Sequence, residues 1–222
     1  MDLEAFSNEN RKQIMKRVRR ALRRTGDLSN AARIDPVRPV VLPKPGSEDD
    51  LIAHFRECLQ RAGGIVAELG ATEKIPTHVA GVLKEKGAPM KVVLGADEGL
   101  RALDWGSAGL SIAGTEAIES DYAGVSRAVC AMAETGSVVL CSGPDNPTSI
   151  NFLVKYHFVM LMREQVVPYF EDTWNLLRSR FDKGRWARAV NFVTGPSTTG
   201  DVEATLTVGV HGPGHFEALL ID

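Results

Sequence analysis

The chain has few cysteines, and this scarcity excludes several classes of protein. Only three occur among the 222 residues, Cys58, Cys130 and Cys141, and no two of them form a Cys-x-x-Cys pair. An odd number of widely spaced cysteines indicates neither a disulfide framework nor an iron–sulfur or zinc motif. We therefore expect small buried thiols in a reducing compartment, and no metal or other cofactor bound by this chain.

Long apolar runs are also absent. No stretch approaches the roughly 20 apolar residues of a membrane-spanning helix. The start, Met1-Asp2-Leu3-Glu4, lacks the basic and apolar regions of a signal peptide, so a cytoplasmic location is predicted. With 44% hydrophobic residues, 24% charged residues and a net charge of −2, the composition is that of a globular protein, and the chain as a whole is not built to bind nucleic acid.

Charge is distributed unevenly along the chain. The first 24 residues hold eight basic and three acidic residues, a net charge of +5, which leaves −7 for the rest. The spacing of Ile14, Val18 and Ala21 predicts a helix from Ser7, as N-cap, to about Arg24. This basic arm could dock on a partner or on its own domain. Its modest charge and lack of interleaved aromatic residues argue against nucleic acid.

The arm is followed by a proline-rich connector that contains Pro36, Pro39, Pro43 and Pro45. Four prolines favour an extended path over a packed element. We therefore divide the chain into an arm and connector over residues 1–46 and a folded domain over residues 47–222.

Short apolar strands alternate with helices from residue 47 onwards. This alternation predicts an α/β domain with a mainly parallel sheet and helices on both of its faces. Strands are expected over 65–67, 91–95, 109–113, 137–141, 157–162, 189–194 and 217–221. Helices are expected over 47–61, 76–86, 122–132 and 167–181.

The most informative stretch is residues 194–213, which follow an expected buried strand. Ligands of open α/β sheets bind beyond the carboxyl ends of strands. The turn Thr194-Gly195-Pro196-Ser197 offers backbone amides and hydroxyls, to which Thr198 and Thr199 add, and such a turn can hold an anion. A tight turn capped by its own hydroxyls is the alternative interpretation.

Two acids and a histidine follow that turn. Asp201 and Glu203 share one face if the segment is a strand, and they are suited to general base chemistry or to holding a hydroxylated ligand. Ordinary solvent exposure is the alternative. His211 and Gly212 lie in a loop that ends at His215, and because this loop is not a helix, the four-residue spacing of the histidines does not indicate a metal site.

A second candidate segment, Glu134-Thr135-Gly136, lies between an expected helix and an expected strand. Gly136 suits a helix C-cap, whereas an acid at a helix C-terminus opposes the helix dipole. Glu134 therefore points either into a ligand site or into solvent. His157 begins a strand, where it could orient a substrate or serve only the structure.

Taken in order, these segments resemble the lactate-utilisation protein C family, the stand-alone LUD-domain proteins. The resemblance covers roughly residues 50–222 and is carried by Ala133–Leu140, His157, Thr194–Ser197, Asp201-Val202-Glu203 and Gly209–Pro213. It implies a fold similar to the NagB/RpiA/CoA-transferase-like group. Thr198 stands where the family usually has a basic residue, so backbone amides and hydroxyls are expected to hold an anionic ligand.

The resemblance implies an accessory or substrate-binding subunit of a complex that oxidises L-lactate to pyruvate, with iron–sulfur clusters in partner subunits. An independent enzyme of the same fold, acting on a small anionic substrate, is the first alternative, because a glutamate can serve as an acyl-accepting nucleophile. A regulatory module that uses the basic arm is the second. The catalytic candidates are Glu134, Asp201, Glu203 and His211, and the ligand-binding candidates are Thr135, Gly136, His157, Thr194, Gly195, Pro196, Ser197, Thr199 and Gly212.

Overall fold

The computed structural model describes residues 3–21, 47–118, 122–181, 186–200 and 206–222, and the chain divides into two units, residues 1–42 and 43–222. The first unit contains helix α1 (Leu3–Ala21). The predicted start at Ser7 is wrong, because Leu3, Glu4 and Ala5 have high helix propensity and already belong to the helix. The predicted connector lies almost entirely outside the described residues.

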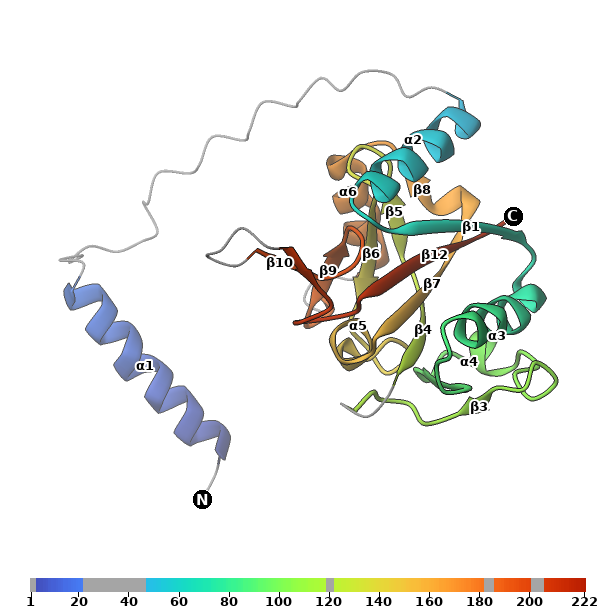
Figure 1. The fold of residues 1–222 in the computed structure, drawn as a ribbon. Helices are drawn as coiled ribbons and strands as arrows, with labels where there is room; N and C mark the ends of the chain where they lie inside the picture. Colours follow the sequence, from blue (N-terminus) through green and yellow to red (C-terminus); the bar gives the residue numbers. More distant parts are fainter. Residues whose placement is uncertain (1–2, 22–46, 119–121, 182–185, 201–205) are drawn as a thin grey trace. The chain divides into compact units, whose positions relative to one another are not determined.

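The second unit is built on a six-stranded sheet in which every pair of neighbours is parallel. The strand order is β1-β12-β7-β4-β2-β3 (Figure 1). The strands are β1 (Ile65–Gly70), β2 (Lys91–Leu94), β3 (Ser111–Ile112), β4 (Ala123–Arg127), β7 (Tyr156–Met162) and β12 (His215–Ile221). The three central strands β4, β7 and β12 are almost wholly buried, as expected when both faces are covered. The predicted mainly parallel α/β fold is confirmed.

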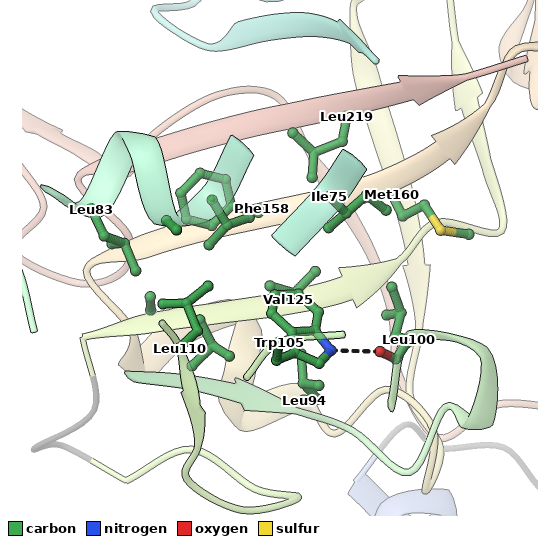
Figure 2. Packing of buried hydrophobic residues seen from close by; sticks show 14 of the residues in the cluster. Ile75, Leu83, Leu94, Leu100, Trp105, Leu110, Val125, Phe158, Met160 and Leu219 are labelled. Carbon is green, nitrogen blue, oxygen red and sulfur yellow. Dashed lines mark hydrogen bonds between the residues drawn. The ribbon is translucent and has the colours of Figure 1, made fainter. Parts of the chain in front are cut away.

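Helices cover one face of this sheet. They are α3 (Ile75–Glu85), preceded by the 3₁₀ turn η2 (Thr72–Lys74), and the short α4 (Glu98–Arg101). Ile75 and Leu83 of α3 belong to the same buried cluster as Phe158 of β7 (Figure 2). Trp105 closes the cluster, and its indole Nε1 donates a 2.7 Å hydrogen bond to the carbonyl oxygen of Leu100, so that its polar atom is satisfied inside an apolar core.

A second, four-stranded sheet shares the other face with α2 (Glu48–Arg61) and α5 (Thr148–Leu153). Its order is β8-β5-β6-β9, with β5 (Cys130–Met132), β6 (Ser137–Cys141), β8 (Val166–Val167) and β9 (Val190–Val193). Helix α6 (Phe170–Arg180) packs on the far side of this sheet. The remaining elements are η3 (Arg163–Gln165) and the antiparallel pair β10 (Thr198–Gly200) and β11 (Leu206–Val208).

Two sequence-based expectations are wrong. The helix expected over 122–132 is instead strand β4 followed by strand β5. Both strands are buried on two faces, so their apolar run has no alternation that would separate it from a helix. The strand expected at 189–194 is confirmed as β9, but the expectation that it is buried is wrong, because β9 lies at the edge of the second sheet and is half-buried.

Helix α2 begins where the sequence predicts. The Ser47 hydroxyl accepts a hydrogen bond from the Asp50 amide at 3.3 Å, and the Asp50 carboxylate accepts one from the Ser47 amide at 3.0 Å. This reciprocal capping box satisfies two amides that the first turn leaves free. Ile52, Phe55 and Leu59 then form the buried face of the helix, as their spacing predicts.

A buried carboxylate joins α3 to the start of β12. Glu217 is only 3% exposed, and its two oxygens accept hydrogen bonds from His78 Nε2 at 2.7 Å and His215 Nε2 at 2.9 Å. Burial alone would raise the pKa of Glu217, but the hydrogen bonds from His215 and His78 outweigh this effect and lower its pKa to about 2. Glu217 is therefore an ionised clamp between a helix and the sheet.

We expect Glu217→Gln to lower the free energy of unfolding by roughly 3 kcal/mol near neutral pH, because the folded pKa lies below the ordinary value of 4.5. This contribution is complete above the unfolded pKa and is lost as pH falls toward the folded pKa of about 2. Urea unfolding of both proteins at a series of pH values measures it. Glu57→Gln, which removes an exposed carboxylate from a pair with Arg61, is the control with a small effect. A deficit that does not shrink below pH 4.5 would contradict the clamp.

Candidate functional site

The structure places the residues predicted to share one ligand site in several different surroundings. Glu134 lies in the turn between β5 and β6 and is exposed. Its Oε1 accepts a 3.0 Å hydrogen bond from the amide of Phe170, the first residue of α6. A carboxylate at a helix N-terminus is favourable to the helix dipole. The expectation that Glu134 follows a helix C-terminus is wrong, because the preceding element is strand β5.

Three hydroxyls form a chain beside Glu134. Ser137 Oγ lies 2.7 Å from Thr135 Oγ1 and 2.6 Å from Thr194 Oγ1, so the chain joins the start of β6 to the end of β9. Side chains alternate along a strand, and Val138 packs toward the parallel sheet. Ser137 therefore faces the opposite way, toward α6. The structure thus brings Thr135 and Thr194 together through Ser137, and their role in ligand binding stays a prediction.

Two of the predicted glycines lie against the C-terminal end of α2. Gly136 and Gly195 have φ values of +68° and +90°. A Cβ atom at Gly136 would lie 2.3 Å from the Leu59 amide nitrogen, and one at Gly195 would lie 2.6 Å from the Ala62 carbonyl oxygen. Both positions therefore require glycine for a close approach of backbones. We call these four residues the α2 junction. Gly136 has the positive φ that the sequence analysis expected. It is not a helix C-cap, however, because the preceding element is strand β5.

His157 lies in the core and is fully buried. Its Nε2 is 2.7 Å from Ser126 Oγ, and its ring packs edge-on against Phe216 with centroids 5.5 Å apart. Burial lowers the pKa of His157 to about 3, which keeps the imidazole neutral. Its Nδ1 has no hydrogen-bond partner among the described residues. A substrate-orienting role for His157 stays a prediction.

The turn that contains Pro196 and Ser197 is joined to the later loop by two backbone hydrogen bonds. The Ser197 amide donates to the Pro213 carbonyl oxygen at 2.8 Å, and the Ser197 carbonyl accepts from the Gly209 amide at 2.8 Å. A Cβ at Gly212 would lie 3.2 Å from Ser197 Cβ.

The other candidates of this segment have different outcomes. Thr199 lies in β10, and His211 is exposed. The predicted acids Asp201 and Glu203 lie outside the described residues, so the ligand and catalytic roles assigned to this segment stay predictions.

A cavity of about 690 Å³ opens at a different place, beyond the carboxyl ends of β2, β3 and β6. The parallel strands contribute Ala96, Thr115 and Glu116, and the second sheet contributes Ser142–Pro144. Pro147–Ser149 at the start of α5 and Trp186–Arg188 before β9 complete the lining. This is the position at which α/β sheets bind ligands. Sequence reasoning missed it, although Ser142-Gly143-Pro144 follows a strand just as Gly195-Pro196-Ser197 does.

Hydrogen bonds between loops fix the walls of this cavity. The Ala96 amide donates to the Pro144 carbonyl oxygen at 2.9 Å. A Cβ at Gly95 would lie 1.9 Å from the Asp145 carbonyl oxygen, so the two loops touch only because residue 95 is glycine. Two serine hydroxyls also accept hydrogen bonds from backbone amides. Ser142 Oγ accepts one from the Ala189 amide at 2.9 Å, and Ser149 Oγ accepts one from the Ala117 amide at 3.1 Å.

An ion pair braces the strand ends next to the cavity. Arg127, at the end of β4, donates from Nε and Nη2 to the two carboxylate oxygens of Asp97 at 2.6 and 3.0 Å. Burial would raise the pKa of Asp97, but the hydrogen bonds from Arg127 and from the Leu100 amide hold that pKa below its ordinary value. The bidentate pair thus ties the loop after β2 to β4.

The three cysteines are free thiols in the structure. Burial raises the pKa of Cys130 to about 11, which keeps this thiol protonated and unreactive. No three histidine, cysteine or acidic side chains are arranged to hold a metal ion within the part of the chain that the structure describes. None of the described helices is long and apolar enough to cross a membrane.

Comparison with known proteins places this chain among relatives of one kind. The model of the LUD domain family matches residues 52–221. Lactate utilization protein C from Geobacillus thermodenitrificans (strain NG80-2) is 29% identical over 188 residues, which cover 75% of this chain and 76% of that protein. The protein of the same name from Geobacillus kaustophilus (strain HTA426) is 34% identical over 99 residues, 44% of this chain but only 41% of that relative.

A solved structure has the same fold. The crystal structure of a DUF162 family protein from Deinococcus radiodurans matches with a TM-score of 0.60 and 16% sequence identity. The match covers 80% of this chain and all of that chain. At this identity the likeness supports the fold alone.

The α2 junction predicts a stability difference between two glycines. Gly136 and Gly87 both have positive φ, but a Cβ at Gly87 meets nothing within 4 Å. We expect Gly87→Ala to cost about 1 kcal/mol, the cost of placing alanine in the left-handed region. Gly136→Ala should cost several times more, because its Cβ would strike the α2 backbone. Urea unfolding measures both. Equal losses would show that the junction tolerates a side chain.

Proposed function

The chain belongs to the LUD domain family, and we propose on this basis that it is a subunit of a system that uses lactate. The proposal is carried by the relative called lactate utilization protein C, which aligns with 75% of the chain. Its finer form is an accessory or substrate-binding subunit of a complex that oxidises L-lactate to pyruvate.

Iron–sulfur clusters of such a complex are proposed to lie in partner subunits. Oxidation of lactate to pyruvate removes two electrons and two protons, so it requires an electron acceptor. Common iron–sulfur clusters are held by four cysteine thiolates, whereas this chain has three cysteines at distant positions. A division of labour follows, in which this chain binds a ligand or a partner and another subunit moves the electrons.

The alternative of an independent acyl-transferring enzyme depends on Glu134 as nucleophile. The carboxylate of Glu134 is engaged by the Phe170 amide at the start of α6. That bond gives Glu134 a structural task, and so we favour the subunit role over the enzyme.

We expect deletion of the gene for this chain to abolish growth on L-lactate while growth on pyruvate continues, since only the oxidation step would be lost. Growth curves on the two carbon sources measure this. A tagged copy of the full chain that restores growth should also co-purify with proteins that contain iron and acid-labile sulfide. Normal growth of the deletion strain on L-lactate, with no such protein recovered, would refute the proposal.

A further inference from the structure

We propose that the cavity beyond β2, β3 and β6 binds a phosphorylated compound with a flat heteroaromatic ring, of the nucleotide or flavin mononucleotide class. This inference goes beyond the proposed function, because it concerns a ligand much larger than lactate. It rests on the lining of the cavity alone. Three kinds of group on the cavity wall carry it: an exposed indole ring, a guanidinium that forms no ion pair with the described residues, and hydroxyls with protons to donate.

The indole is that of Trp186, which lines the cavity and is 44% exposed. Its ring centroid lies 5.6 Å from that of Phe181 and 6.3 Å from that of Trp174. Trp174 in turn packs against Phe192 of β9 at 5.8 Å. An aromatic ring that is held by its neighbours and still exposed in a cavity offers a stacking surface for a flat heterocycle.

The guanidinium belongs to Arg188, two residues along the same wall. Arg188 is exposed and forms no ion pair with any residue in the described parts of the chain. Its rigid fork of donors matches two oxygens of a phosphate group. Trp186 and Arg188 together therefore suit a ligand that carries a ring and an anion a short distance apart.

The hydroxyls are those of Ser142 and Ser149. Ser142 accepts a hydrogen bond from the Ala189 amide, and Ser149 accepts one from the Ala117 amide. Neither hydroxyl donates a hydrogen bond to another described residue. A hydroxyl that accepts in this way keeps its proton for an acceptor in the cavity, such as a phosphate oxygen.

The remaining charged group on the wall is Glu116. Its exposed carboxylate is suited to accept hydrogen bonds from sugar or ribityl hydroxyls, as acidic residues do in other nucleotide sites. It also repels anions, which directs the phosphate toward Arg188.

The size of the cavity agrees with this ligand class. About 690 Å³ lies within the range of roughly 300–1,000 Å³ that is typical of sites for drug-sized molecules and cofactors. A three-carbon acid would occupy only a small part of this volume. A mononucleotide has a ring that can stack on Trp186 and sugar hydroxyls that can donate to Glu116. Its phosphate can accept from Arg188 and from the two serine hydroxyls.

The test uses the purified full chain and two probes, AMP and flavin mononucleotide, with binding measured by titration calorimetry and tryptophan fluorescence. We expect saturable binding of at least one probe. Trp186→Ala should weaken it by roughly 5- to 150-fold, the range for loss of one stacked base, while Trp186→Phe retains most of it. Arg188→Gln should weaken binding of the phosphorylated probe but not of adenosine or riboflavin. Arg178→Gln, an exposed arginine of α6 that does not line the cavity, should change nothing.

Three outcomes would overturn the proposal. They are absence of saturable binding of both probes, binding that neither Trp186→Ala nor Arg188→Gln alters, and inorganic phosphate alone binding as tightly as AMP. Circular dichroism establishes that each variant is folded before it is titrated. Because the measurement uses the isolated chain, it is independent of lactate growth, and either proposal can fail without the other.

Discussion

The α2 junction is the contact on which the arrangement of the second sheet depends. Strand β6 begins immediately after Gly136, and the turn after β9 contains Gly195, so both strands are anchored where these glycines meet Leu59 and Ala62. Any side chain at either glycine would push the sheet away from α2. The Ser137–Thr194 hydrogen bond and the Glu134 cap on α6 add polar contacts at the same end. Backbone proximity, rather than side-chain burial alone, therefore sets this sheet against the parallel one.

The cavity lies at the opposite end of the same two strands. Strand β6 spans five residues, roughly 17 Å, before Ser142, and β9 starts just after Arg188. The two strands are antiparallel and paired along their length, so a shift at the α2 junction would move Ser142 and Arg188 together. The segments that are most distinctive in the sequence thus position a cavity that they do not line.

Local signals in the sequence predict α2, α3, α6 and most strands of the parallel sheet, because capping and burial leave local patterns, but they give the central strand β4 as a helix. Ser47 with Asp50 is one example, and the apolar run of β7 is another. Within the second sheet, β6 and β9 are predicted, whereas β5 and β8 leave no such pattern, since they are three and two residues long and their mutual pairing joins segments far apart in the sequence. Adjacency to a strand end likewise indicates neither the sheet nor the face on which a side chain lies. Ser137 and Val138 are an example: they are neighbours in β6, yet Ser137 faces α6 and Val138 faces the core.

Some polar side chains of this domain are buried in the fold, others are exposed at the cavity wall, and the chemistry open to the two groups differs. His157 and Glu217 are both buried in the parallel sheet, yet one is neutral and the other ionised, because His157 has one serine partner whereas Glu217 has two imidazoles. Hydrogen bonds hold both side chains inside the fold. Arg188, Glu116 and Trp186 are instead exposed on the wall of the cavity. Trp186 packs against Phe181 and Trp174 and is still partly exposed, and Arg188 forms no ion pair with the described residues, so we propose ligand recognition at this wall.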